Sequence, residues 1–170
     1  GYLNNYTNAI PILYDYGFHA TIFVISNKIG DDVLFEKNKK LRIMGSRILK
    51  NISKLDKISI GSHSQSHNYL PHLSREEILK ELKNSKTDLE NVTGNRIKYL
   101  SYPFGGVDHR VSRLAQRAGY SEGFSVWTEA ERPFARLRIP IATADSWWRL
   151  WLKTSALYFP LKTLRSRLTV

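Results

Sequence analysis

Two histidines four residues apart, His63 and His67, are the side chains of this sequence best suited to bind a metal ion. They follow a short β-like run, residues 57–60, which Gly61 and Ser62 end. Residues four apart lie on the same side of one helical turn, so the two imidazoles can converge. Neutral imidazole is a common zinc ligand, and α/β folds place their active sites after strand ends. The pair predicts part of a metal site or, in the simpler interpretation, two polar loop residues.

The composition restricts how such a site could be completed. The chain of 170 residues has no cysteine, which excludes disulfides and thiolate ligands and leaves His, Asp and Glu as further ligands. A catalytic zinc usually has three protein ligands and one open position, so two histidines are not enough. His72 and His109 are predicted to be surface residues, and the completing ligand is not evident from spacing alone.

Charge and hydropathy narrow the class of protein only in part. The hydrophobic fraction of 42% predicts one main domain with a buried core. The net charge of +11 is compatible with nucleic acid, anionic lipid or anionic polysaccharide as a partner. No apolar run reaches the length of about 18 residues that a membrane span needs, and no signal peptide is visible in these residues.

Hydrophobic periodicity predicts strands that alternate with helices. The clearest helix spans residues 75–92, begins with the capping box of Ser74 and Glu77, and ends at Gly94. Further helices are predicted at 5–16, 44–55 and 108–118. Strands are predicted at 19–25, 57–60, 96–102, 123–127 and 137–141. Residues 30–40 are predicted to form a loop, and no regular element is predicted from residue 147 onward. The apolar run at 19–25 predicts a strand buried on both faces. This alternation indicates parallel βαβ units, in an open sheet or a barrel.

Several motifs follow one another in a specific order around the histidine pair. They are residues 8–13 with Gly17 and 20–24, the Gly-Ser-His-Ser-x-x-His segment at 61–67, Tyr-Pro-Phe-Gly at 102–105, Gly-Tyr at 119–120, and Arg-Ile-Pro at 138–140. In this order and spacing they resemble the polysaccharide deacetylases, also called NodB-homology domains or carbohydrate esterase family 4. The resemblance covers roughly residues 1–141.

The resemblance implies an α/β fold, a distorted (β/α) barrel that is usually seven-stranded, and removal of N-acetyl groups from amino sugars. It implies a divalent metal, most often zinc, held by two histidines and one aspartate. His63 and His67 match the two histidines. The backbone N–H of Phe104 matches the oxyanion donor, Pro103 stiffens the loop that aims this amide, and Ser64 is expected to hydrogen-bond within the histidine loop.

The chain also departs from the family pattern. The Asp-Asp pair that supplies the third ligand and the catalytic base is expected immediately before Gly1, so residues 1–146 are predicted to be a deacetylase domain that lacks its N-terminal strand. Ser101 stands where many members have arginine. The family's late histidine, its general acid, has no counterpart because no histidine follows His109. Asp145 lies in the corresponding region and is a weak substitute.

Three features allow two interpretations each. Tyr102 could be a core residue or line the substrate groove, and Trp127 could stack on a sugar ring or belong to the core. Residues 147–170 form a basic aromatic C-terminal extension with no acidic residue. Such a segment can pack its aromatic side chains over the end of the barrel or lie on an anionic membrane surface.

The sequence thus predicts a metal-dependent hydrolase that deacetylates an N-acetylated amino-sugar polysaccharide or oligosaccharide at the cell envelope or outside the cell. The alternative is a catalytically inactive carbohydrate-binding module on the same fold. Binding to nucleic acid is disfavoured, because the basic residues are spread along the chain instead of forming a stripe interleaved with aromatics. The sequence does not indicate which glycan is used or the oligomeric state.

Overall fold

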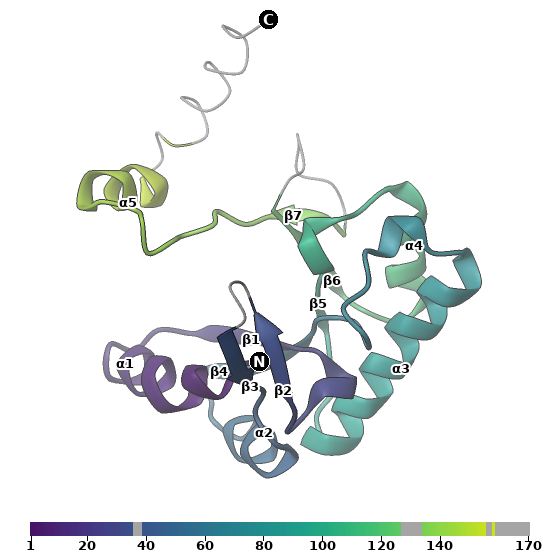
Figure 1. Ribbon diagram of the computed structural model, residues 1–170, viewed down its shortest axis with the longest axis horizontal. Helices are drawn as coiled ribbons and strands as arrows, with labels where there is room; N and C mark the ends of the chain where they lie inside the picture. Colours follow the sequence, from purple (N-terminus) through teal and green to yellow (C-terminus); the bar gives the residue numbers. More distant parts are fainter. Residues whose placement is uncertain (36–38, 127–133, 156–157, 159–170) are drawn as a thin grey trace, which may run out of the picture. The chain divides into compact units, whose positions relative to one another are not determined.

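The structure is a computed structural model that describes residues 1–35, 39–126, 134–155 and 158. The chain divides into two compact units, Gly1–Leu137 and Arg138–Val170. The first unit holds a parallel sheet and most of the described helices, and the described part of the second unit holds a short helix (Figure 1). Each unit is described separately below.

A five-stranded sheet forms the centre of the first unit. Its strands lie in the order β1 (Ala20–Val24), β4 (Ile58–Ser62), β5 (Tyr99–Ser101), β6 (Glu122–Ser125) and β7 (Arg136–Leu137). All four pairings are parallel, which confirms the predicted mixed α/β fold with a parallel sheet. Among the described residues, no pairing joins β1 to β7. The carboxyl ends of all five strands lie at one edge.

Helices connect these strands. Helix α2 (Ser46–Ile52) precedes β4, α3 (Arg75–Thr93) links β4 to β5, and α4 (His109–Arg117) links β5 to β6. A π-helical turn, η1 (Asn5–Ala9), and α1 (Ile10–Asp15) precede β1. Fully buried apolar side chains from strands and helices form the shared core, among them Val24, Leu49, Leu82, Leu89 and Leu100.

The predicted start and end of α3 are confirmed. The Glu77 backbone N–H donates to the Ser74 hydroxyl at 3.3 Å, and the Ser74 N–H donates to the Glu77 carboxylate at 2.8 Å. Gly94 ends the helix with a left-handed φ of 73°, which glycine adopts without a steric penalty. A 19-residue helix is therefore fixed at both ends by local sequence.

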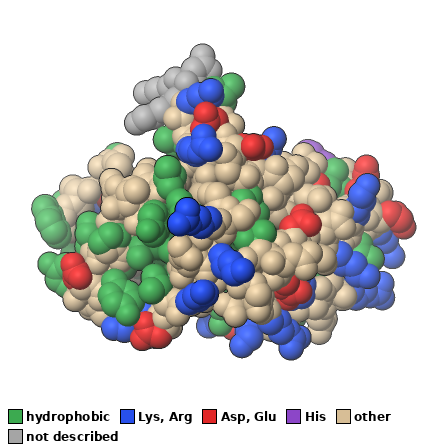
Figure 2. All heavy atoms as spheres, turned by 90° about the horizontal axis from the view of Figure 1, so that it is seen from below, with side chains coloured by type: hydrophobic (Ala, Val, Ile, Leu, Met, Phe, Trp, Pro, Cys, Tyr) green, Lys and Arg blue, Asp and Glu red, His purple; other side chains and the backbone are tan. Residues whose placement is uncertain are grey.

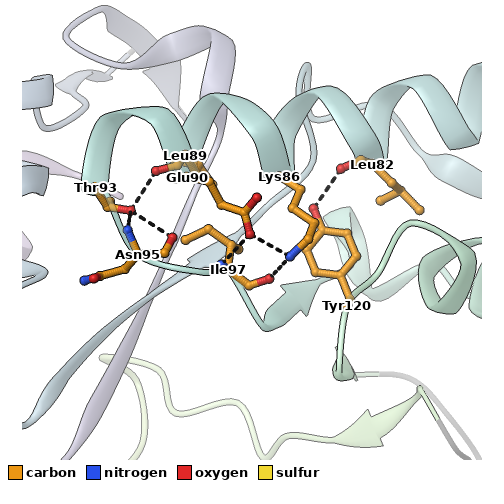
Figure 3. A network of polar contacts seen from close by, with 8 residues as sticks. All are labelled: Leu82, Lys86, Leu89, Glu90, Thr93, Asn95, Ile97 and Tyr120. Atoms are coloured by element: carbon orange, nitrogen blue, oxygen red, sulfur yellow. Dashed lines mark hydrogen bonds and ion pairs between the residues drawn. The ribbon is translucent and has the colours of Figure 1, made fainter.

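Polar contacts also connect α3 to the chain leading into β5 (Figure 3). Lys86 donates to the Ile97 carbonyl and pairs with Glu90 at 2.9 Å, and the Glu90 carboxylate accepts from the Ile97 N–H at 2.9 Å. The Tyr120 hydroxyl donates to the Leu82 carbonyl at 2.9 Å. These contacts set the position of α3 along the sheet.

Three predictions about the elements are wrong in instructive ways. Residues 30–40 are not a loop, because they contain strand β2 (Asp32–Phe35) and the start of β3 (Lys39–Arg42), which pair antiparallel. The many charged residues of this segment are typical of a surface loop, which is why the sequence predicted one. Strand β1 is not buried on both faces, because Thr21 is exposed and Phe23 half-buried at the edge of the described sheet. The C-terminal segment does contain a helix, α5 (Trp147–Thr154).

The surface of the first unit is uneven in character. Figure 2 shows hydrophobic side chains gathered at the end that η1 and α1 form, and numerous Lys and Arg side chains toward the opposite end. In the second unit, Trp147, Trp148 and Trp151 on α5 are exposed, and Lys153 pairs with Asp145 at 2.6 Å. Within the described part of the chain, no helix has the length and hydropathy that crossing a membrane requires.

Candidate functional site: a histidine pair at the carboxyl end of the sheet

His63 directly follows β4, at the sheet edge where all the parallel strands end. Its backbone N–H donates to the Val24 carbonyl at 2.8 Å, which continues the β1–β4 ladder by one residue. Its ring nitrogen Nδ1 lies 2.7 Å from the Ser101 carbonyl at the end of β5. Because a carbonyl only accepts, this contact places the proton on Nδ1 and leaves the lone pair on Nε2.

His67 turns its ring back toward His63. The two Nε2 atoms lie 3.2 Å apart, and the ring centroids lie 4.8 Å apart with the rings inclined at 66°. Burial lowers the pKa of His67. This favours the neutral imidazole, which is the form that coordinates metals.

The loop between the histidines is not a helical turn, contrary to the spacing argument. Residues 63–67 are irregular, with bends at 65 and 66, and both Ser64 and His67 have a left-handed φ of 63°. The buried Ser64 hydroxyl accepts from the His67 N–H at 3.0 Å, and the Ser64 N–H donates to the Ser62 hydroxyl at 3.2 Å. The imidazoles converge because the chain reverses within this loop.

One polar stripe of α3 binds the histidine loop. Glu81, Asn84, Ser85 and Asp88 have the spacing i, i+3, i+4 and i+7, which places them on one face of the helix. One oxygen of Glu81 accepts from the N–H groups of Gln65 and Ser66 at 3.1 and 2.8 Å. Because those two residues lie between the histidines, a single carboxylate holds the centre of the loop.

The other residues of this stripe hold the flanks of the same loop. Asn84 donates to the Gln65 side chain at 3.2 Å, and the hydroxyls of Ser85 and Ser62 lie 2.7 Å apart. Asp88 accepts from the Ser26 hydroxyl at 2.9 Å, which connects α3 to the loop after β1. Sequence reasoning missed these residues; the signal available was a run of short or acidic side chains beside the apolar stripe of α3.

The segment after β5 forms the opposite wall of the site. Phe104 has a φ of 56°, its ring is 61% exposed, and its centroid lies 4.7 Å from that of His67. The Phe104 N–H has no hydrogen-bond acceptor among the described residues. Buried Pro103 precedes it and begins a 3-10 turn, η5 (Pro103–Gly105), in which the N–H groups of Gly105 and Gly106 are bonded.

Gly1 lies beside the end of β1. Its nitrogen donates to the Phe23 carbonyl at 2.7 Å, and its carbonyl accepts from the Met44 N–H at 2.9 Å. The next carbonyl of β1, that of Val24, accepts from the His63 N–H, so Gly1 lies near the start of the histidine loop.

The histidine geometry fits a shared cation. Two nitrogens bound to one tetrahedral zinc at about 2.0–2.1 Å lie roughly 3.4 Å apart, and the two Nε2 atoms here are 3.2 Å apart. The Ser101 carbonyl orients the His63 ring, as outer partners of metal-binding histidines commonly do. Within the described residues, no group of three His, Cys, Asp or Glu side chains could hold a metal. The pair could therefore supply two ligands, and a third would have to come from outside the described residues.

The remaining predicted residues lie elsewhere. The Tyr102 side chain is fully buried and its hydroxyl donates to the Phe134 carbonyl at 2.6 Å, so it belongs to the core and does not line a groove. Trp127 lies outside the described residues. Asp145 belongs to the second unit, where Lys153 and the Ala142 N–H bind its carboxylate and lower its pKa.

Comparison with known proteins agrees with this geometry. The family model for polysaccharide deacetylases matches residues 1–123. YxkH of Bacillus subtilis is 31% identical over 125 residues, which are 72% of this chain and 40% of YxkH. The poly-β-1,6-N-acetyl-D-glucosamine N-deacetylase of Staphylococcus aureus is 28% identical over 136 residues, which are 75% of this chain and 46% of that protein. The chain therefore spans less than half the length of these curated relatives.

A solved structure supports the fold independently. The Streptococcus pyogenes deacetylase PplD, in complex with acetate, has a TM-score of 0.74 and 23% sequence identity, covering 91% of this chain and 66% of that one. Such a likeness concerns the fold alone, whereas the family model concerns the sequence motifs themselves. Since the motif order, the parallel sheet and the match over residues 1–123 agree, this chain belongs to the polysaccharide deacetylase family.

Proposed function

We propose that this chain belongs to a metal-dependent hydrolase that removes N-acetyl groups from an amino-sugar glycan, giving acetate and a free amine. The observation that carries the proposal is the convergence of the His63 and His67 Nε2 atoms to 3.2 Å at the carboxyl edge of the sheet. The polysaccharide and chitin deacetylases among its relatives make an N-acetylated glycan at the cell envelope or outside the cell the proposed substrate.

His63 and His67 would hold a divalent cation, with zinc the best match to two imidazoles and no thiolate. When bound, such a cation lowers the pKa of a water molecule and polarises the acetyl carbonyl. In this proposal, the third ligand and the catalytic base are aspartates directly before Gly1, as the family motif implies. The contact of Gly1 with the Phe23 carbonyl supports this assignment, because the adjacent Val24 carbonyl accepts from the His63 N–H.

The wall opposite the loop supplies the remaining group. In this proposal the unbonded N–H of Phe104 donates to the oxyanion that forms when the acetyl carbonyl becomes tetrahedral. The left-handed φ of Phe104 and the preceding Pro103 fix the direction of this N–H. Ser64 and the Ser101 carbonyl act as positioning groups, since they hold the backbone of His67 and the ring of His63.

We further propose that the deacetylase domain comprises residues 1–146 and that residues 147–170 form a basic aromatic extension. The exposed Trp147, Trp148 and Trp151 of α5, together with Arg149 and Lys153, suit a peripheral contact with an anionic membrane surface. Such a contact would place the domain next to envelope glycans.

Zinc binding tests the proposal most directly. Calorimetry would compare the 170-residue chain with two extended chains. In one, the signature of the family that contains the Asp-Asp pair, Thr-Phe-Asp-Asp, precedes Gly1, and in the other Thr-Phe-Asn-Asn does. We expect one-to-one binding to be tight only with Asp-Asp, and His63→Ala or His67→Ala to abolish it. The Asn-Asn chain controls for the added length, because it differs only in its two carboxylates.

Acetate release from an N-acetylglucosamine oligomer would then test the reaction itself. We expect release from the Asp-Asp chain with zinc, and none from the Asn-Asn chain. Zinc binding that survives both histidine substitutions would refute the metal site. Glycan binding without zinc binding or acetate release in every chain would instead favour the inactive carbohydrate-binding module.

A further inference from the structure

Four arginines line one small surface cavity of the first unit. The cavity, of about 60 Å³, lies between the start of α3 and one face of α4 and is lined by Arg75, Arg110, Arg113, Leu114 and Arg117. Arg110, Arg113 and Arg117 have the spacing i, i+3 and i+7, so they share a face of α4. Like charges at this spacing destabilise a helix by about 0.2–0.5 kcal/mol per pair.

These charges are poorly compensated within the described part of the chain. No described carboxylate lies within 4 Å of the guanidiniums of Arg75, Arg113 or Arg117. Arg110 has only Asp108, at 3.8 Å, and the other oxygen of Asp108 caps α4 by accepting from a backbone N–H at 2.7 Å. For comparison, Arg136 contacts Glu122 at 2.6 Å.

Two of the guanidiniums are held in place by backbone groups. Arg110 is half-buried and donates to the Pro71 carbonyl at 2.7 Å, while Arg113 donates through Nε to the His109 carbonyl at 3.3 Å. Each contact uses one N–H and leaves other donors of the same planar group available. Preorganised guanidiniums bind oxyanions better than free ones, because less side-chain freedom is lost on binding.

We propose that this arginine cavity binds a phosphate group. Several guanidiniums match a phosphate better than a carboxylate, because a phosphate offers more acceptor oxygens and more negative charge. The segments after His67 and Phe104 lead into α3 and α4, and the Arg110–Pro71 contact joins the first turn of α4 to the segment that precedes α3. The cavity is therefore at the same end of the sheet as the histidine pair. A phosphate on an envelope lipid or glycan would anchor the domain there.

Nuclear magnetic resonance titration of the 170-residue chain tests the proposal. Inorganic phosphate would be added at a constant ionic strength of about 0.15 M, with chloride as the reference anion. We expect saturable shifts of the arginine Nε–H signals with phosphate and none with chloride. The double variant Arg113→Gln and Arg117→Gln should weaken phosphate binding roughly tenfold or more, since it removes two charge-assisted contacts.

A matched control removes the same number of charges elsewhere. Arg47→Gln and Lys50→Gln alter exposed residues of α2, and this variant should bind phosphate like the unaltered chain. Non-saturable shifts, equal shifts with chloride, or equal weakening in both double variants would overturn the proposal. Circular dichroism of both variants verifies that α4 and α2 remain folded.

The source of the phosphate is distinguished by a second arm. Sedimentation with vesicles of phosphatidylcholine and phosphatidylglycerol would compare the same three chains. If the Arg113→Gln, Arg117→Gln variant loses vesicle binding and the Arg47→Gln, Lys50→Gln control does not, a lipid headgroup is a source of the phosphate. If the first variant loses only the binding of free phosphate, the phosphate is soluble or carried by a glycan. Loss in neither assay overturns the proposal. All readouts are of binding, so they are independent of the proposed deacetylation.

Discussion

Glu81 is expected to determine whether the histidine loop keeps its shape. It is 8% exposed, and one of its oxygens accepts two backbone N–H groups, from Gln65 and Ser66, at 3.1 and 2.8 Å. Hydrogen bonds to a charged group contribute about 1.5–3 kcal/mol each, and neutral ones about 1 kcal/mol. Glu81→Ala removes both bonds, and Glu81→Gln keeps an acceptor of similar shape but removes the charge.

These magnitudes predict a graded effect on the loop. At the lower limit, Glu81→Ala destabilises the closed loop relative to the open loop by about 3 kcal/mol. This corresponds to roughly 100-fold faster hydrogen exchange of the Gln65 and Ser66 amides. Glu81→Gln should cost about 1–1.5 kcal/mol, or roughly tenfold. Hydrogen exchange of Gln65 and Ser66, measured by nuclear magnetic resonance on the 170-residue chain, checks both values without a metal.

A control separates this local effect from a general loss of stability. Lys83→Ala changes an exposed residue of the same helix and should leave both amides protected. Zinc affinity of the Asp-Asp chain should fall in the order unaltered, Glu81→Gln, Glu81→Ala, since the loop must be closed for the imidazoles to converge. If Glu81→Ala leaves the Gln65 and Ser66 amides as protected as Lys83→Ala does, the carboxylate does not hold the loop and the reasoning fails.

Three further substitutions test the framework around the site. Tyr102→Phe removes a buried hydroxyl that donates to a carbonyl, so chemical denaturation should show a loss of about 1–1.5 kcal/mol, and an unchanged midpoint would contradict the bond. Gly61→Ala places a methyl group 2.6 Å from the Phe23 ring, and we expect a loss of about 1–3 kcal/mol in the same assay. Backbone and side-chain hydrogen bonds from Ser74 lower the pKa of Glu77, so this stabilisation is complete above the ordinary pKa of 4.5 and is lost as the pH falls through the lowered value. Ser74→Ala should raise the pKa of Glu77 in a carboxylate titration, and no change would contradict the capping box.

Local sequence signals predicted the elements whose boundaries depend on neighbouring residues. The start of α3 follows from Ser74 and Glu77, and its end from Gly94, because capping is a short-range interaction. The hairpin of β2 and β3 was missed, since its pairing depends on contacts between two charged segments. Strand β1 has the composition of a buried strand, yet its exposure depends on its place in the sheet.

The candidate site shows the same division between local and distant information. The histidine pair was found from spacing, although the structure brings the rings together through a chain reversal instead of a helical turn. The partners that orient the pair are distant in sequence: Ser101 is 38 residues from His63, and Glu81 is 16 residues from Gln65. Ser101 acts through its backbone carbonyl, so no side chain could have indicated this role.

Backbone strain is concentrated at this site. Among the described residues, four that are not glycine have a left-handed φ, and Ser64, His67 and Phe104 line or hold the histidine pair. Each such conformation costs roughly 1–2 kcal/mol, so it persists only where surrounding contacts impose it. Here those contacts are identifiable: Glu81 and Ser62 hold the loop, and the 3-10 turn after Pro103 holds Phe104. The energy of folding is thus used to bring two imidazoles together and to place the Phe104 ring beside one of them, which is the arrangement on which the proposed metal-assisted hydrolysis depends.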